Sequence, residues 1–445
     1  MKRILLAILI ATPFVGQGQT VMTLDECIQL AEANNRRIEA SEQQFLASRY
    51  DLHSTKALFF PSFSLSGNVL YSTSDGSYAS GSGLLPVLGA DGVPTGQSAF
   101  FPSIDLSYGL DWIFNGGIKV EQPLYMGGKI RTGYRMAKIG HEIAQLNKRL
   151  TETDVIVETS RAYAEVVRTQ ELMQVATSYH SLLNELLRAV ESAWKHGMKS
   201  QNEVLKVKVK LDESELNLRR AENGHRLATM NLCHYIGVPL SEQINVEYTW
   251  PVTDDSYEQG TSIYNRPEYL ILEQKVGLAQ QQVAMARSEH LPQIGLVGQY
   301  GYTNGIELNG RKLFDDWNFL VGVQVSIPIF DFGHRINKIK SAKAQYAQAQ
   351  AEREDINEKL TLEMAQSLNN LDEAFLERKL AESSVVSAEE NLRTSRMHYE
   401  KGMETLSDYL EAQTLWQQAH QTQVNARVNC YLKRLEYLRT IGSVR

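Results

Sequence analysis

Residues 105–124 read DLSYGLDWIFNGGIKVEQPL, and apolar side chains occupy most even-numbered positions of this stretch. These positions are Leu106, Tyr108, Leu110, Trp112, Phe114, Ile118, Val120 and Leu124. Polar or charged side chains such as Asp105, Ser107, Lys119 and Glu121 stand between them. Because successive side chains of a β-strand point to opposite faces, the stretch predicts a strand with an apolar environment on one face and water on the other.

The same pattern returns 205 residues later, where DWNF at 316–319 repeats DWIF at 111–114. The spacing then holds without a gap until IG at 236–237 is repeated at 441–442. Agreement over more than one hundred residues in one register indicates duplication of a large unit.

Upstream of this point the spacing becomes 231, which aligns PSFSLSGNVLY at 61–71 with PQIGLVGQYGY at 292–302. The first half therefore carries 26 additional residues between Tyr71 and Asp111. The segment SDGSYASGSGLL at 74–85 lies in this insertion, and its Gly and Ser content predicts a surface loop.

Four strands are predicted for each chain, at 61–73, 105–125, 292–303 and 316–330. Four strands cannot close a barrel, and an open sheet edge is not tolerated in lipid. Two chains would give eight strands with a filled interior, whereas three would give twelve strands with room for a pore. Alternation alone also fits a soluble antiparallel sheet that packs one face on a core.

Long helices are predicted between the strands, at 128–196 and 333–400, with shorter returning helices at 200–236 and 405–441. At 1.5 Å per residue each long helix would extend about 100 Å, so the helices must pack on one another as coiled coils. A filamentous coiled-coil protein is the alternative that the helices taken alone support.

The two helical hairpins turn with the same pattern, HGMKSQNEVL at 196–205 and KGMETLSDYL at 401–410. Gly197 and Gly402 can adopt the left-handed conformation that ends a helix. Each glycine is followed by a capping box that starts the returning helix, formed by Ser200 with Glu203 and by Thr405 with Asp408.

The predicted organisation begins with a secretory signal peptide at 1–18, since Lys2 and Arg3 precede a short apolar segment. The first repeat follows at 19–237 and starts with N-terminal helices. An inter-repeat linker at the equator of the helical region occupies 238–265. The second repeat covers 266–445 and starts with a helix at 266–290.

Composition excludes several classes of protein. The chain has a formal net charge of -7, which disfavours nucleic acid as a partner. Its three cysteines, at unrelated spacings, predict buried thiols rather than a disulfide framework or a zinc site. Beyond the signal no run of about 18 apolar residues recurs, so a membrane-embedded part would have to be a closed barrel.

With these features, the sequence resembles the TolC family of outer-membrane efflux channels. The resemblance covers nearly the whole mature chain and rests on the strand openings, both hairpin tips and three further segments. These segments are TLDECIQLAEANNRRIEA at 23–40, EQPLYMGGKI at 121–130 and SIPIFDFGHR at 326–335.

The resemblance implies an α+β membrane protein that forms a homotrimer. Each chain would give four antiparallel strands to a twelve-stranded barrel in outer-membrane lipid, and the helices would continue it as a coiled-coil barrel in the periplasm. The implied function is a passive exit duct of a tripartite efflux pump or a type I secretion system. A periplasmic adaptor (membrane fusion protein) would open the duct, and an inner-membrane transporter would drive it.

The resemblance also assigns roles to residues at the tips. Asp408 and Glu411 match the segment that narrows the periplasmic entrance with acidic rings, although Asp408 also completes a capping box. Three carboxylates from each ring would attract cations. Tyr399 and Glu203 match the entrance lock between neighbouring helices. Glu404 stands where a family member has a basic residue, so that salt bridge is missing here.

Gly197, Met198, Gly402 and Met403 are candidates for adaptor docking, because a small residue beside an adaptable apolar one suits contact between helix tips. The alternative is that each glycine only ends its helix.

No HExxH, CxxC, P-loop, GxGxxG or GxSxG motif is present, so neither an enzyme nor a metal or cofactor site is predicted. The alternative function is a periplasmic coiled-coil adaptor or structural scaffold without a pore.

Overall fold

The computed structural model describes residues 21–247, 263–313 and 315–444. The predicted signal peptide and the middle of the predicted linker lie outside these residues. The chain divides into two compact units. A sheet unit comprises residues 48–141 and 276–349, and a helical unit comprises the rest of the described chain.

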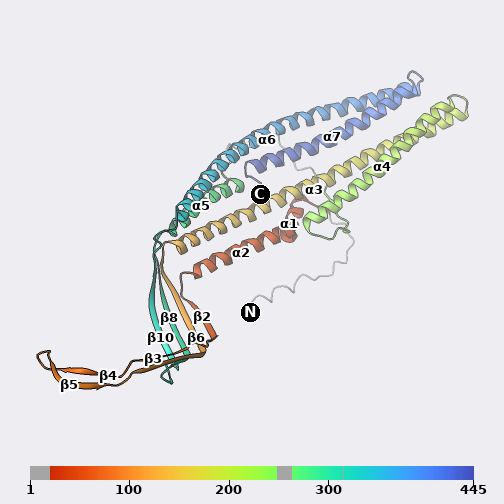
Figure 1. Cartoon of the computed structure of the whole chain (residues 1–445). Helices are drawn as coiled ribbons and strands as arrows, with labels where there is room; N and C mark the ends of the chain where they lie inside the picture. Colours follow the sequence, from red (N-terminus) through yellow and green to blue (C-terminus); the bar gives the residue numbers. More distant parts are fainter. Residues whose placement is uncertain (1–20, 248–262, 314, 445) are drawn as a thin grey trace. The chain divides into compact units, whose positions relative to one another are not determined.

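The sheet unit is built on four long antiparallel strands in the order β10-β8-β6-β2 (Figure 1). They are β2 (Ser62–Tyr71), β6 (Asp105–Met126), β8 (Gln293–Leu308) and β10 (Asp316–Ser326). All four predicted strands are present. The last is shorter than predicted and ends before Pro328, which has no N–H to donate to a partner strand.

The register of the sheet puts the apolar positions of all four strands on one face. Leu65 pairs with Ile118, Ile118 with Tyr300, and Tyr300 with Phe319. On the other face, Ser64 pairs with Lys119. Since residues directly opposite each other share a face, the two-sided character predicted from the sequence is confirmed.

The insertion in the first repeat is not a loop, and that prediction is wrong. It forms β3 (Asp75–Ala79), which pairs with β6, and then a separate hairpin of β4 (Gly83–Leu88) and β5 (Pro94–Phe101). The Gly and Ser residues suggested a loop, but the apolar residues that follow them favour strands. The second repeat has only the short β9 (Arg311–Lys312) at this end of the sheet.

The helices include two of 67 residues each, α3 (Lys129–Lys195) and α6 (His334–Glu400). Each ends in the helical unit at a tight turn and is followed by an antiparallel helix, α4 (Gln201–Ile236) or α7 (Leu406–Thr440) (Figure 1). The remaining helices are α1 (Leu24–Asn34), α2 (Arg36–Ala57) and α5 (Pro267–Ser288). The equal lengths of α3 and α6 agree with a duplicated unit.

In the helical unit, a buried cluster packs the start of the first repeat against its end. There Cys27 of α1 and Cys233 of α4 are both fully buried. The short strand β1 (Val21–Met22) pairs in parallel with β7 (Asn245–Val246), so part of the predicted linker is a strand. Burial raises the pKa of the Cys27 thiol to about 12, which keeps it protonated and unreactive. The prediction of buried thiols is confirmed, because Cys430 is buried too.

Within residues 21–247, 263–313 and 315–444, no helix combines the length and the hydropathy needed to span a membrane.

Candidate functional site at the helical hairpin tips

The turns of the two helical hairpins are built alike. Gly197 and Gly402 both have φ of 73°, the left-handed conformation that favours glycine. The next residue in each turn donates its N–H back to the helix, Met198 to the Ala193 carbonyl at 2.9 Å and Met403 to the His398 carbonyl at 2.8 Å. This hydrogen bond is typical of a glycine-terminated helix.

The two methionine side chains are free to meet a partner. Met198 is 72% exposed and Met403 is 69% exposed. An unbranched thioether adapts its shape to an apolar surface. Both glycines do end their helices, so their geometry alone does not select docking over turn formation.

Both predicted capping boxes are present. The Glu203 N–H donates to the Ser200 hydroxyl at 3.3 Å, and the Ser200 N–H donates to the Glu203 carboxylate at 3.3 Å. In the second tip, the Asp408 N–H donates to the Thr405 hydroxyl at 3.3 Å, and the Thr405 N–H donates to the Asp408 carboxylate at 3.1 Å. Each box satisfies backbone groups that the helix leaves unpaired.

Asp408 has an additional hydrogen bond that ties it to the turn. The Thr405 hydroxyl donates to its carboxylate at 2.7 Å. The hydrogen bonds from the Thr405 hydroxyl and N–H lower the pKa of the Asp408 carboxyl below its ordinary value. The carboxylate is therefore charged and fixed at neutral pH.

Glu411 lies one turn further along α7, in a groove of ≈ 430 Å³ between α4 and α7. Lys206 and Lys210 line the same groove, and the Lys206 amine donates to the Ser407 hydroxyl at 3.5 Å. The groove therefore presents cations from one hairpin beside an exposed carboxylate from the other.

Lys199 connects Tyr399 and Glu203, the two residues predicted to form the entrance lock. Its amine lies 4.6 Å from the centre of the Tyr399 ring and 3.6 Å from the Glu203 carboxylate. The Tyr399 ring also stacks on Tyr409, with 5.3 Å between ring centres. Burial is the main cause that raises the pKa of the Tyr399 hydroxyl, so this group stays neutral.

Lys199 and Tyr409 are site residues that the sequence did not predict. Lys199 meets the Tyr399 ring from the other hairpin, and Tyr409 stacks on the same ring from the returning helix. These contacts form only on folding, and no local spacing reports them. The lock itself stays a prediction.

Glu404 is held within its own hairpin. The Ser395 hydroxyl donates to its carboxylate at 2.5 Å, and His398 Nδ1 lies 3.2 Å from the other carboxylate oxygen. The acidic residue therefore has a local role in the second tip.

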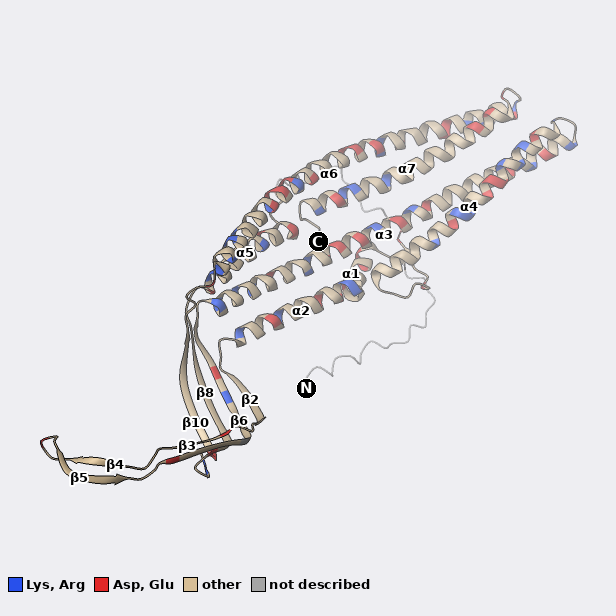
Figure 2. Ribbon diagram, in the orientation of Figure 1, with Lys and Arg blue, Asp and Glu red and all other residues tan. Residues whose placement is uncertain are grey.

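The tips differ in charge (Figure 2). The first, at 195–210, contains five lysines and one acidic residue, Glu203. The second, at 399–411, contains one lysine and four acidic residues. These acidic residues are Glu400, Glu404, Asp408 and Glu411.

A buried apolar cluster lies beneath the tips and joins the hairpins. Leu183 of α3 is fully buried, and Val207 of α4 and Leu406 of α7 are packed in the same cluster. From α6 the cluster receives only the partly buried Leu392 and Tyr399. The second hairpin is therefore anchored to the first mainly through α7.

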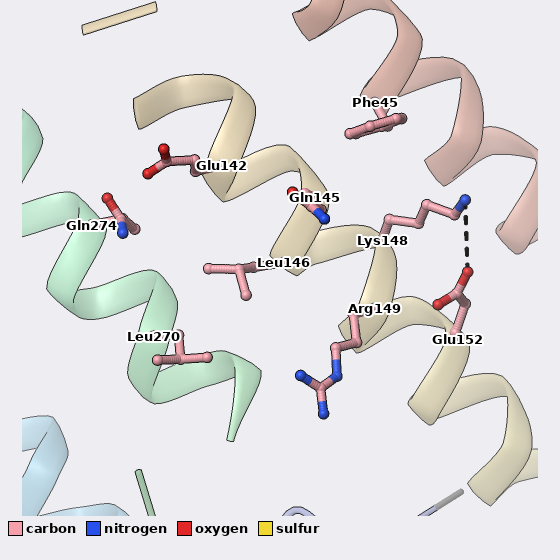
Figure 3. A pocket seen from close by; sticks show the side chains of 9 residues that line it. All are labelled: Phe45, Glu142, Gln145, Leu146, Lys148, Arg149, Glu152, Leu270 and Gln274. Atoms are coloured by element: carbon pink, nitrogen blue, oxygen red, sulfur yellow. Dashed lines mark ion pairs between the residues drawn. The ribbon is translucent and has the colours of Figure 1, made fainter. Parts of the chain in front are cut away.

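A hollow of ≈ 580 Å³ lies elsewhere in the helical unit, between α2, α3 and α5 (Figure 3). The Lys148 amine points toward Glu152 at 3.8 Å and also pairs with Glu42. None of the nine lining residues is fully buried. Because Lys148 and Glu152 pair with each other and none of the lining polar groups is fully buried, this hollow is a weaker candidate than the tips.

Comparison with known proteins identifies two matched segments. The family model described as outer membrane efflux protein matches residues 27–238 and 261–441. The two segments correspond closely to the two repeats.

Individual relatives are distant but extensive. The outer membrane protein TolC of Vibrio cholerae is 21% identical over 375 residues, which cover 80% of this chain and 85% of that protein. The proteases secretion protein PrtF of Dickeya chrysanthemi is 21% identical over 275 residues, covering 60% of this chain and 59% of that protein.

Solved structures share the fold. The CmeC outer membrane channel of Campylobacter jejuni has a TM-score of 0.77 and 19% identity, covering 94% of this chain and 85% of that chain. The outer membrane protein VceC of Vibrio cholerae has a TM-score of 0.75 and 16% identity, covering 94% and 96% of the two chains. The fold class predicted from the sequence is thereby confirmed.

Proposed function

The chain belongs to the outer membrane efflux protein family, and from this premise we propose that it is the exit duct of a tripartite efflux pump or type I secretion system. It acts as a passive conduit from the periplasm to the exterior and performs no chemistry. An inner-membrane transporter supplies the driving force, and a periplasmic adaptor opens the duct.

The apolar face of the sheet carries this proposal. Leu65 is 83% exposed, Phe63 73% and Phe319 75%, and they share that face. A soluble protein does not leave a sheet face of this kind to water. Outer-membrane lipid is the environment that would cover it.

Aromatic residues flank this face at both ends, as they do in outer-membrane strands. At the end away from the helices, Tyr71 packs on Trp112 and Tyr300 stacks on Trp317, with 5.0 Å and 5.1 Å between ring centres. At the other end, Phe330 packs on Phe332 at 4.7 Å. These residues would mark the two membrane–water interfaces.

The sheet edges support a homotrimer. In the described chain, β2 and β10 each have one strand neighbour, so both present unpaired backbone groups. Lipid does not tolerate such edges, and pairing β2 of one chain with β10 of the next removes them. Three chains give twelve strands and a pore.

The helices support the same assembly. Both α4 and α6 carry exposed apolar side chains, which a neighbouring chain would cover. On α4 they are Leu205, Val209, Leu216 and Leu227, and on α6 Leu362, Leu376 and Leu380. In the trimer the helices would form the barrel that extends into the periplasm.

The tips are proposed as the adaptor-docking and gating end. Gly197 with Met198 and Gly402 with Met403 would meet the adaptor. The carboxylates of Asp408 and Glu411, repeated three times, would form acidic rings at the entrance. Tyr399 and Glu203 would form the lock, with Lys199 as their shared cation.

Membrane insertion tests the proposal through a matched pair of variants. Leu65→Arg places a charge on the apolar face and is expected to cost about 2–4 kcal/mol near the middle of the bilayer. Ser64→Arg, on the opposite face, is expected to insert like the parent. The measurements are the fraction recovered in outer membranes and the number of chains by native mass spectrometry.

Recovery of the parent chain in the soluble periplasm, or as a stable monomer, would contradict the proposal. That outcome would favour the alternative, an adaptor or scaffold without a pore. Equal insertion of Leu65→Arg and Ser64→Arg would remove the assignment of the lipid-facing side.

A further inference from the structure

The β4–β5 hairpin is apolar on both faces. Leu84 pairs with Phe100, and these side chains are 69% and 68% exposed. On the opposite face, Leu85 is 54% exposed and Phe101 is 38% exposed. Between residues 76 and 104 the only charged residue is Asp91.

The hairpin continues the β3–β6 ribbon beyond the four-stranded sheet (Figure 1). The Ser80 N–H donates to the Ile104 carbonyl at 3.0 Å and thereby joins the two parts. The turn closes where the Gly89 N–H donates to the Val93 carbonyl at 2.8 Å. Its strands reach on the order of 30 Å past the sheet at about 3.3 Å per residue.

A partner is needed for this element to be stable. An isolated two-stranded hairpin is marginal in water even when its side chains are polar. Here both faces expose large apolar groups, and contiguous exposed apolar surface marks an interaction site. In the second repeat, the corresponding turn at Asn309 and Gly310 needs no such cover.

Lipid is a poor occupant of both faces. The hydrocarbon core does not accept the unpaired backbone edges of an open hairpin. A hairpin lying on the membrane surface would bury one face and would need a polar face toward water. Strand addition is also disfavoured, since Pro86, Pro94 and Pro102 interrupt the edges.

We propose that the occupant is a second copy of this chain: the β4–β5 hairpins of three subunits pack face to face across the outer end of the barrel. The proposal rests on the trimer proposed above. In a three-fold ring each subunit contacts its two neighbours with different surfaces. Two apolar faces on one hairpin satisfy that geometry, one face for each neighbour.

The resulting cap is an apolar constriction at the exit of the duct. Apolar constrictions stop ion flow by excluding water. The cap restricts leakage through the outer end until cargo separates the hairpins. It is independent of the tips, which control the other end.

Crosslinking of single cysteines tests the cap in the full-length trimer. Asp91→Cys places a thiol at the hairpin turn, and the native cysteines are buried and protected from labelling. A bismaleimide that spans about 10 Å is expected to link these thiols into dimers and trimers. Lys312→Cys, at the β8–β9 turn of the same sheet end, is the control. Its copies lie on the barrel rim, on the order of 20 Å apart.

A double variant adds a functional readout. Leu84→Glu with Phe100→Glu places two charges on one face, and repulsion within the cap is expected to raise single-channel conductance at least about twofold. Gln97→Glu adds a charge to the hairpin without removing an apolar group and is expected to leave conductance near the parent value.

Failure of the cap and failure of the proposed trimer give different results in these experiments. Native mass spectrometry that finds no trimer overturns the proposed assembly. A trimer whose Asp91→Cys thiols do not crosslink, or crosslink no better than Lys312→Cys, overturns the cap. Quenching of a fluorophore on Asp91→Cys by lipid-attached quenchers also overturns it, because the hairpin then lies in the membrane. Unchanged conductance of the double variant counts against the constriction.

Discussion

The two helical hairpins share one plan but differ in how they are packed. In the first, α3 contributes Leu183 and Val190 to the buried cluster beneath the tips. The positions 205 residues later on α6 are Ala388 and Ser395. Small and polar residues have replaced large apolar ones, so α6 adds little to the cluster. Beneath the tips the first hairpin supplies both of its helices to the cluster, and the second hairpin is attached mainly through α7.

The two hairpins also differ in the charge of their tips. The first tip is basic and the second is acidic, and Lys199 of the first contacts the ring of Tyr399 in the second. Beneath the tips, α3 of the basic hairpin is closely packed and α6 of the acidic hairpin is not, so we expect the acidic tip to move more easily than the basic one. If the hairpins differ in this way, the largest effect of a substitution is expected in the packed cluster.

Leu183→Ala is expected to destabilise the helical unit by about 3 kcal/mol, because it removes a fully buried side chain and leaves a cavity. Leu392→Ala on α6 is the matched control and is expected to cost about 1 kcal/mol, since that residue is only partly buried. The measurement is the guanidinium dependence of the helical circular dichroism signal. Equal losses for the two variants would mean that the hairpins are packed alike.

The acidic character of the second tip is tested by cation block of the reconstituted channel. Asp408→Asn with Glu411→Gln removes two charges per subunit and preserves side-chain shape and the oxygen acceptor of the capping box. We expect block by a trivalent cation to weaken about tenfold, because the proposed acidic rings lose their charge. Glu222→Gln, further along α4 where Glu222 pairs with Arg219, is the control and should change block little. Unchanged block in the double variant would discard the acidic rings.

Much of the fold could be predicted because the spacing of apolar residues and of helix-ending glycines depends only on the local sequence. The alternation around Trp112 and the repeat at Trp317 predict strands, and Gly197 and Gly402 predict the ends of the long helices. These signals depend on side chains close in sequence. They are therefore readable before the chain folds.

The remaining features depend on tertiary contacts. The Gly-rich start of the insertion suggested a loop, yet pairing of Leu84 with Phe100 makes a hairpin. The position of Lys199 between Tyr399 and Glu203 joins two hairpins, and no spacing within either one reports it. Of the candidate site, the turn chemistry was predictable and the contacts between tips were not.

Lys199→Gln tests the link between the tips. The cation contacts the Tyr399 ring and the Glu203 carboxylate, and a partly exposed contact of this kind contributes about 0.5–1 kcal/mol. Its loss is expected to raise the open probability of the channel about two- to fivefold. Lys208→Gln is the control, since Lys208 pairs with Glu191 inside the first hairpin. A similar increase in both variants would point to general charge loss instead of a specific link.

The smallest expected effect is a response of the second tip to acid, which follows from the capping role of Asp408. Hydrogen bonds from Thr405 lower the pKa of its carboxyl in the folded tip. The charged carboxylate therefore stabilises the turn at pH values above the ordinary Asp pKa of about 3.9. This contribution is lost as the pH falls through the lower folded pKa. No change is expected between about pH 5 and pH 7.

A spin label on Met403→Cys measures this response as side-chain mobility, with Met198→Cys reporting on the first tip. We expect the second tip to become more mobile only below about pH 4. In Asp408→Asn that acid-induced step should disappear, because an amide has no proton to gain. Mobility that rises above about pH 5, or that rises equally with and without Asp408, would show that another group controls the turn.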